Sequence, residues 1–217
     1  MLEKMADFFK NRLDGYDVHM LTEIDGAEEF YDFTASMLPT ARQCCILDLG
    51  CGTGLEAERY LKINPTAQIT GIDLCSEMLD NFRSKFPAGD NIKLICGSYF
   101  DVPFGTACFD AAVSAESLHH FTAEQKLPLY RRLHRSLKCG GYFILTDYFA
   151  ESEEAEWEYF EDLNRLKKDR GITDNEFYHY DTPLTAEHEI DVLRTAGFSS
   201  AEILRNWGAT YTVKAYV

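Results

Sequence analysis

Short apolar runs alternate with stretches of helical spacing between residues 44 and 147. Apolar runs without polar alternation are typical of strands that are buried on both faces of a sheet. The stretch over 122–138 opens with the capping-box pair Thr122 and Gln125. Alternating strands and helices predict a mostly parallel sheet with helices on both faces. The predicted strands are 44–49, 68–73, 92–96, 109–114 and 142–147, and the predicted helices are 55–63, 76–86 and 122–138.

The pattern changes on either side of this region. Residues 1–43 carry two apolar stripes at helical spacing, with a predicted loop or helix break at 15–20 between them. A very acidic helix is predicted at 151–168, and an aromatic loop follows at 177–180. Near the end of the sequence, 201–206 and 210–217 are close enough to form an antiparallel hairpin. The two stripes are Met5, Phe8, Phe9 and Leu13, then Phe30, Phe33, Thr34 and Met37.

These changes divide the 217 residues into parts of one predicted domain. We expect the segments before and after the alternating region to form a helical cap over the sheet, since they have no packing partner of their own. The parts are a cap at 1–43, a core at 44–149, a cap insertion at 150–183, and a terminal helix and hairpin at 184–217.

The composition narrows the class of protein. With 36 acidic and 21 basic residues, the formal net charge is −15, which repels phosphate backbones and disfavours nucleic acid as a partner. The seven cysteines are odd in number and show no metal-ligand spacing, so we expect reduced thiols, a cytoplasmic location and no metal site. No apolar run approaches the length of a membrane span. A monomer or a homodimer is equally compatible with the sequence.

A glycine-rich turn follows the first predicted strand. Glycines at a strand-to-helix turn let a ligand approach the backbone, and the helix N-terminus favours an anionic group. Asp73 ends the second strand, and a carboxylate at this edge of a parallel sheet suits the vicinal hydroxyls of a ribose. In a dinucleotide fingerprint the third glycine follows the second by three residues. That position is 55 in this chain, where Leu55 stands, so the spacing of the glycines disfavours a nicotinamide dehydrogenase. The pattern favours S-adenosylmethionine.

Several segments resemble the class I S-adenosylmethionine-dependent methyltransferases, in particular the branch that acts on small molecules. Residues 48–54 (DLGCGTG) are similar to the family's first motif, and 73–79 (DLCSEML) to its acidic second motif. Residues 118–121 (LHHF) and 137–141 (LKCGG) are similar to later family segments, although Cys139 replaces the usual proline. The resemblance implies a doubly wound, Rossmann-like α/β fold with a seven-stranded, mostly parallel sheet and an antiparallel C-terminal strand.

Site residues follow from this resemblance by position. The backbone from Gly50 to Gly54 would face the methionine part of the cofactor, and Asp73 would hold the ribose. Leu74 and Met78 would pack against the adenine, and Tyr16 would close over the cofactor. The full set of implied cofactor residues is Tyr16, Asp48, Gly50, Cys51, Gly52, Gly54, Asp73, Leu74, Met78, Ser98, Tyr99, Ala115 and Glu116.

The acceptor side is predicted from a second group of residues. His119 and His120 follow the fourth strand and are candidate general bases, although capping and core packing are equally ordinary roles for them. Asp147 and Tyr148 end the fifth strand, and the aromatic loop that contains Tyr178 and Tyr180 resembles a lid over an acceptor pocket. The main contribution of such an enzyme is positioning, because the methyl group is already activated by the sulfonium.

The expected function is methyl transfer to a small-molecule acceptor, with S-adenosylhomocysteine as the second product. Two alternatives stay open. A regulatory or assembly protein would bind the same cofactor without transferring its methyl group. A nucleic-acid (tRNA) methyltransferase would use basic patches such as Arg131, Arg132 and Arg135, against the overall charge. A carboxylated variant of the cofactor is also compatible with the sequence.

Overall fold

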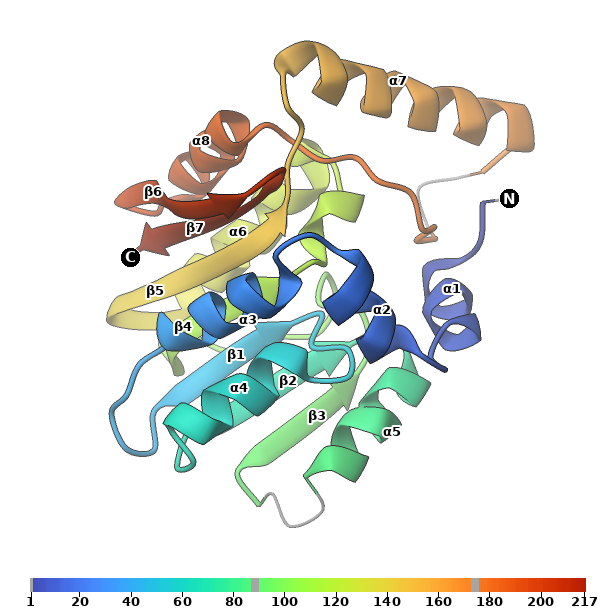
Figure 1. Ribbon diagram of the computed structural model, residues 1–217. Coiled ribbons are helices and arrows are strands. Elements are labelled where there is room, and N and C mark those ends of the chain that lie inside the picture. Colours follow the sequence, from blue (N-terminus) through green and yellow to red (C-terminus); the bar gives the residue numbers. More distant parts are fainter. Residues whose placement is uncertain (1, 87–89, 173–175) are drawn as a thin grey trace.

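The computed structural model describes residues 2–86, 90–172 and 176–217. Its centre is one seven-stranded sheet in the order β3-β2-β1-β4-β5-β7-β6 (Figure 1). Strands β1 to β5 are parallel where they pair with one another, and β7 runs antiparallel to both of its neighbours. The strands are β1 (Cys45–Leu49), β2 (Gln68–Asp73), β3 (Ile92–Cys96), β4 (Phe109–Ala115), β5 (Leu137–Tyr148), β6 (Ser200–Trp207) and β7 (Thr210–Tyr216).

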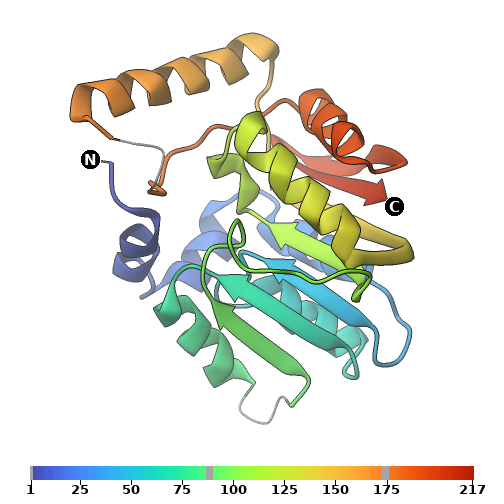
Figure 2. The same cartoon turned by 180° about the vertical axis from the view of Figure 1, so that it is seen from behind.

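Helices cover both faces of this sheet. The helices are α1 (Met5–Asn11), α2 (Tyr16–Glu23), α3 (Ala27–Ser36), α4 (Leu55–Ile63), α5 (Ser76–Lys85), α6 (Ala123–Ser136), α7 (Glu153–Arg170) and α8 (Ala186–Ala196), with a 3-10 turn η1 (Leu118–His120). One apolar cluster joins α3, α4 and α5 to the sheet, and α6 and α8 pack on the opposite face (Figures 1 and 2). The predicted seven-stranded, mostly parallel α/β fold with an antiparallel end is therefore confirmed.

The packing follows from side-chain chemistry. Ile46, Leu47 and Leu49 of β1 are each at most 1% exposed, as expected for a central strand buried on both faces. Leu129 and Leu133 of α6, which lie one turn apart on the same face of the helix, are each at most 1% exposed and pack against the sheet. Within the described ranges, none of the helices combines the length and the apolar character that crossing a bilayer requires.

The N-terminal segment contacts the loop after α7. Met5 donates its backbone N–H to the carbonyl of Phe177 at 2.9 Å, and His179 donates to Glu3 at 3.0 Å. The rings of Phe8 and His179 stack with their centroids 3.4 Å apart. Helix α7 lies outside the two helical layers, next to this loop (Figure 1). These contacts bring two segments that are distant in sequence to the carboxyl-end side of the sheet.

One local prediction was wrong. Residues 15–20 were expected to form a loop or helix break, but α2 begins at Tyr16. The break lies just before it, where Gly15 has a left-handed backbone (φ 82°) and starts the new helix. The apolar stripe of α2 is weak, since Met20 is its only buried residue, so hydrophobic periodicity gave little signal there.

Candidate active site

The glycine turn between β1 and α4 requires glycine for steric reasons. Gly50 has φ 74°, and a Cβ atom there would lie 2.1 Å from Ser117 Oγ. Gly54 has φ 81°, and a Cβ there would lie 2.9 Å from the ring of Phe82. At Gly52, the nearest atom to an added Cβ is a backbone oxygen 3.9 Å away. The turn therefore packs tightly against the protein at its ends and faces open space at its middle.

Asp73 fixes the second strand end to this turn. One carboxylate oxygen accepts the Gly52 N–H at 2.8 Å, and the other accepts the Cys75 N–H at 2.8 Å. Burial raises the pKa of Asp73, while these backbone donors act in the opposite direction. The carboxylate thus holds the glycine turn beside the start of α5, at the edge where ligands of parallel sheets bind.

Two further carboxyl groups lie under the turn. Asp48 and Glu56 are 1% and 5% exposed. Burial raises the pKa of Glu56 to about 7, and burial together with the nearby Glu56 raises the pKa of Asp48 well above its usual value. Glu56 also lines the cavity next to the turn. The sequence analysis overlooked Glu56, because an acidic residue in the first turn of a helix is common for dipole reasons alone.

A single cavity extends from the glycine turn to His120 and Phe177. It encloses about 730 Å³ of space between atoms, a volume that includes its open mouth. All of the predicted cofactor residues line it except Asp48, which is buried below the turn, and Gly54, which caps α4. Lining residues that the sequence analysis did not identify include Met5, Phe9, Tyr31, Thr53 and Phe121.

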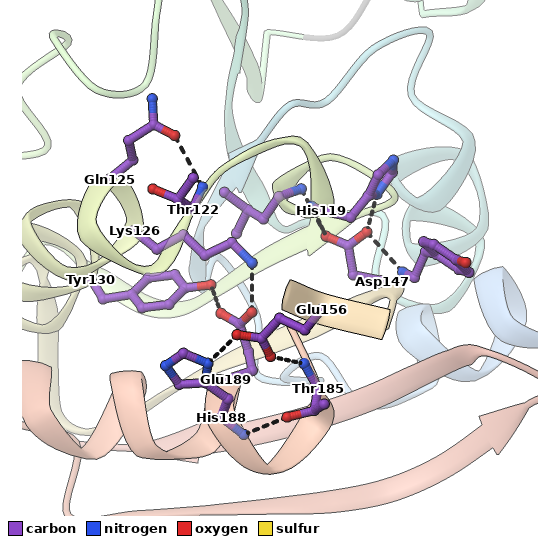
Figure 3. Close-up of polar contacts among 12 residues, drawn as sticks. His119, Thr122, Gln125, Lys126, Tyr130, Asp147, Glu156, Thr185, His188 and Glu189 are labelled. Carbon is purple, nitrogen blue, oxygen red and sulfur yellow. Dashed lines mark hydrogen bonds and ion pairs between the residues drawn. The ribbon is translucent and has the colours of Figure 1, made fainter. Parts of the chain in front are cut away.

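His119 precedes the lining residue His120 in sequence but does not itself line this cavity, and it is held by Asp147 (Figure 3). The two side chains approach to 2.5 Å between His119 Nδ1 and Asp147 Oδ1. Asp147 also accepts backbone N–H groups from Leu118, His119 and Tyr148. Burial disfavours the charged ring, but the charge and hydrogen bond of Asp147 outweigh it and raise the pKa of His119 to about 9.

His120 lies in a different environment although it is the next residue. Its side chain is 3% exposed and lines the cavity. Burial, followed by the charge of His119, lowers the pKa of His120 to about 4, so the ring is neutral at pH 7. Glu116 stands at the end of β4 with φ 50°, a backbone conformation that is strained for a residue with a Cβ and is often found at functional sites.

The predicted acceptor residues occupy the region beyond His120. Tyr178 and Tyr180 line a second cavity, which shares His120, Phe121 and Phe177 with the first. The hydroxyl groups of Tyr148 and Tyr159 hydrogen bond at 3.0 Å and join β5 to α7. Asp147 is 2% exposed and lines neither of these two cavities. The structure thus brings the aromatic loop next to the cofactor cavity and keeps Asp147 behind His119.

Comparison with known proteins identifies the fold and the family. Residues 46–141 match a family of methyltransferase domains. The fold is similar to that of a putative O-methyltransferase from Nostoc punctiforme (21% identity, TM-score 0.67), with 87% of this chain and 56% of that one covered. It is also similar to human N-acetylserotonin methyltransferase in complex with S-adenosylmethionine (19% identity, TM-score 0.62; 86% and 51% covered). Residues 46–141 therefore match a methyltransferase domain, and the chain has the fold of solved methyltransferases.

Relatives of this methyltransferase domain differ in their named substrates. The chain is 27% identical to a malonyl-[acyl-carrier protein] O-methyltransferase of Herminiimonas arsenicoxydans over 169 residues, which cover 77% of this chain and 57% of the relative. It is 27% identical to a probable tRNA methyltransferase 9B of Homo sapiens over 156 residues, with 68% and 32% covered. The chain spans 57% of the length of the first of these relatives and 32% of the length of the second.

Proposed function

We propose that this protein is an enzyme that transfers the methyl group of S-adenosylmethionine to a small-molecule acceptor. The observation that carries the proposal is the continuous cavity between the glycine turn and His120, with a second cavity adjoining it under the cap. The first cavity suits a nucleoside with a cationic sulfonium, and the second offers an aromatic pocket beside it. Of the cap segments of the proposed division, 1–43 supplies Met5 and Phe9 to this region, and 150–183 supplies Phe177 and Tyr180.

The cofactor placement that we propose uses the carboxyl ends of β1 and β2. The backbone at Gly50 and Gly52 faces the methionine part, and the Asp73 carboxylate keeps lone pairs for the ribose hydroxyls after accepting its two backbone N–H groups. Leu74 and Met78 pack against the adenine, and Tyr16 covers the cofactor from α2. The remaining proposed contacts, along the methionine part or beside the adenine, are Asp48, Cys51, Gly54, Ser98, Tyr99, Ala115 and Glu116.

Acceptor activation is assigned to His120, because of the two predicted bases only His120 is neutral at pH 7, whereas Asp147 keeps His119 protonated by raising its pKa. His120 lines both cavities, and its neutral ring faces the region where the acceptor would lie. Asp147 acts through His119 as a positioning residue, since its oxygens bind His119 and backbone N–H groups. Tyr148, Tyr178 and Tyr180 are proposed acceptor contacts. The transfer is an in-line displacement at an activated carbon, so alignment of the two reactants supplies most of the rate.

Two rival functions have specific support. The first rival is a regulatory protein that binds the cofactor without transferring its methyl group; the similarity of the fold to that of the [4+2]-cyclase SpnF (24% identity, TM-score 0.62; 82% and 59% covered) supports the view that this fold also occurs in a protein named for another activity. Methylation of tRNA is favoured by the named tRNA methyltransferase relatives. The net charge of −15 opposes the second rival, because binding of nucleic acid requires neutralised phosphates.

The test combines binding with turnover. S-adenosylhomocysteine affinity is measured by calorimetry for the wild type, for Asp73→Ala and for Asp80→Ala, a matched exposed acid on the following helix. We expect Asp73→Ala to lower the affinity for S-adenosylhomocysteine by roughly 10-fold or more, because it removes a charged hydrogen-bonding group. Asp80→Ala should leave this affinity unchanged. Transfer of labelled methyl to a panel of small molecules and to tRNA then separates the functions. Tight binding without transfer to any acceptor favours the first rival, and preferential binding of NADH contradicts the proposal.

A further inference from the structure

Three potential metal ligands converge at the end of the cofactor cavity. They are His119 Nε2 and His120 Nδ1 from η1 and Asp181 Oδ1 from the loop before α8, and these atoms lie within 4.8 Å of one another. The loop is fixed beside η1, because Thr182 donates its backbone N–H to the carbonyl of His119 at 2.7 Å. Asp181 is far from the histidines in sequence, which is why residue spacing did not indicate a ligand set.

His119 is held in the orientation of a metal-binding histidine. Its Nδ1 is bound to Asp147 at 2.5 Å, which leaves Nε2 directed away from that carboxylate and 3.7 Å from Asp181 Oδ1. Histidine ligands in proteins usually donate their second ring nitrogen to a carboxylate, which fixes the tautomer and the ring orientation. Asp147 is itself fixed by backbone N–H groups, so the whole arrangement is rigid.

Two of the three candidate ligand atoms are buried without a hydrogen-bond partner among the described residues. They are His120 Nδ1 and Asp181 Oδ1, which face each other 3.0 Å apart. Buried polar atoms of proteins are normally satisfied by a partner, and a cation bound by both of these atoms would satisfy the nitrogen and the oxygen together. The His120 side chain is only 3% exposed, whereas Asp181 is 43% exposed and provides access from solvent.

The distances agree with ligation of a small cation. Zinc binds imidazole nitrogen and carboxylate oxygen at about 2.0–2.2 Å, which places tetrahedral ligand atoms about 3.4 Å apart. The observed separations of 3.0 and 3.7 Å lie on either side of this value. A second group, Glu116, His119 and Asp147, is equally close together, but its oxygens already accept hydrogen bonds from Thr210, His119 and backbone N–H groups.

We propose that His119, His120 and Asp181 bind one divalent transition-metal ion, with Asp147 as the residue that positions His119. Two imidazoles and one carboxylate are typical of catalytic zinc and of related ions, and they leave a further coordination position open. An ion at this place is adjacent to the cavity that His120 lines, where it can polarise an oxygen of the acceptor. The role of the ion in polarising the acceptor rests on the proposed function, whereas the binding of the ion does not depend on it.

Titration with Co²⁺ tests the site directly. Full-length protein is treated with a chelator and then titrated with Co²⁺ without cofactor or acceptor, while the visible spectrum and the bound metal per chain are measured. We expect one Co²⁺ per chain, displaced by Zn²⁺. Binding is lost in His120→Gln and in Asp181→Asn, and it weakens about 10–100-fold in Asp147→Asn. His188→Gln is the control, since His188 pairs with Glu156 between α7 and α8 (Figure 3) and binds no ion in this scheme.

Three results would overturn the proposal: no stoichiometric binding, binding that is unchanged in Asp181→Asn and His120→Gln, or charge-transfer bands that show cobalt bound to cysteine thiolates. Asp181→Asn remains decisive if His120→Gln fails to fold, because Asp181 is partly exposed. Binding of S-adenosylhomocysteine is measured in parallel. If the wild type does not bind S-adenosylhomocysteine, the proposed function is refuted, while the result for metal binding is unaffected.

Discussion

At one end of the cavity, the glycine turn, Glu56 and Asp73 come from β1, α4 and β2, three consecutive elements of the chain. At the other end, Met5, His120 and Phe177 come from segments that are far apart in sequence. We call these the cofactor end and the acceptor end. The cofactor end depends on local backbone geometry, and the acceptor end depends on contacts between remote segments. This difference explains why a short motif predicts a cofactor and leaves the acceptor open.

The largest expected effect concerns the scaffold of the acceptor end. Lys126 and Glu189 form a buried ion pair at 2.6 Å between α6 and α8, and Tyr130 donates its hydroxyl to the same carboxylate (Figure 3). Glu189→Ala leaves the lysine charge unpaired and lowers the free energy of unfolding by about 3–5 kcal/mol. Urea denaturation measures this, with the exposed Glu187→Ala as control. Equal stability of the two variants would contradict the importance of this remote contact.

The second prediction tests the local geometry of the cofactor end. Gly50→Ala places a methyl group against Ser117 in a left-handed backbone conformation, so we expect a loss of about 3 kcal/mol in stability together with loss of S-adenosylhomocysteine binding. Gly208→Ala has a similar φ of 58° but no atom within 4 Å, and should cost only about 1 kcal/mol. Similar losses in both variants would show that backbone conformation alone, and not the tight contact, requires glycine at position 50.

The third prediction concerns the pH dependence of the cofactor end. Since burial raises the pKa of Glu56 to about 7 from an unfolded value of about 4.5, the folded protein holds this proton more tightly than the unfolded chain. The stability that comes from this proton is present below pH 4.5 and is lost as the pH rises through 7, by roughly 3 kcal/mol. The free energy of unfolding, measured from pH 4.5 to 8, should decline less steeply for Glu56→Gln than for the wild type. Parallel curves would contradict this role of Glu56.

The smallest expected effect tests whether the cofactor end and the acceptor end are independent of each other. Tyr148→Phe removes the hydroxyl contact with Tyr159 that joins β5 to α7, and should lower stability by about 1 kcal/mol. S-adenosylhomocysteine affinity should stay at the wild-type value, because Tyr148 does not line the cofactor cavity. Calorimetry and thermal unfolding of the same samples measure both quantities. A clear loss of cofactor affinity would show that the two ends are coupled through β5.

Most of the fold could be predicted from the sequence. Buried strands such as β1 are continuous apolar runs, and α6 has both a capping box and a clear stripe, so local patterns are sufficient for them. Helix α2 was not recognised, because it buries little apolar surface of its own. The residues of the cofactor end were predicted by position from the resemblance to class I methyltransferases, and all but two of them line one cavity. Their roles as cofactor contacts remain predictions.

The sequence by itself determined the alternating strands and helices, the glycine turn and the acidic end of β2, because each depends on residues that are close together along the chain. Only the tertiary structure placed Glu56 under the turn, Asp147 behind His119 and Asp181 opposite His120. The placements of Asp147 and Asp181 depend on the packing of β5, η1 and the loop before α8 around one end of the sheet. No local pattern encodes such contacts, since their energy comes from groups that meet only after folding.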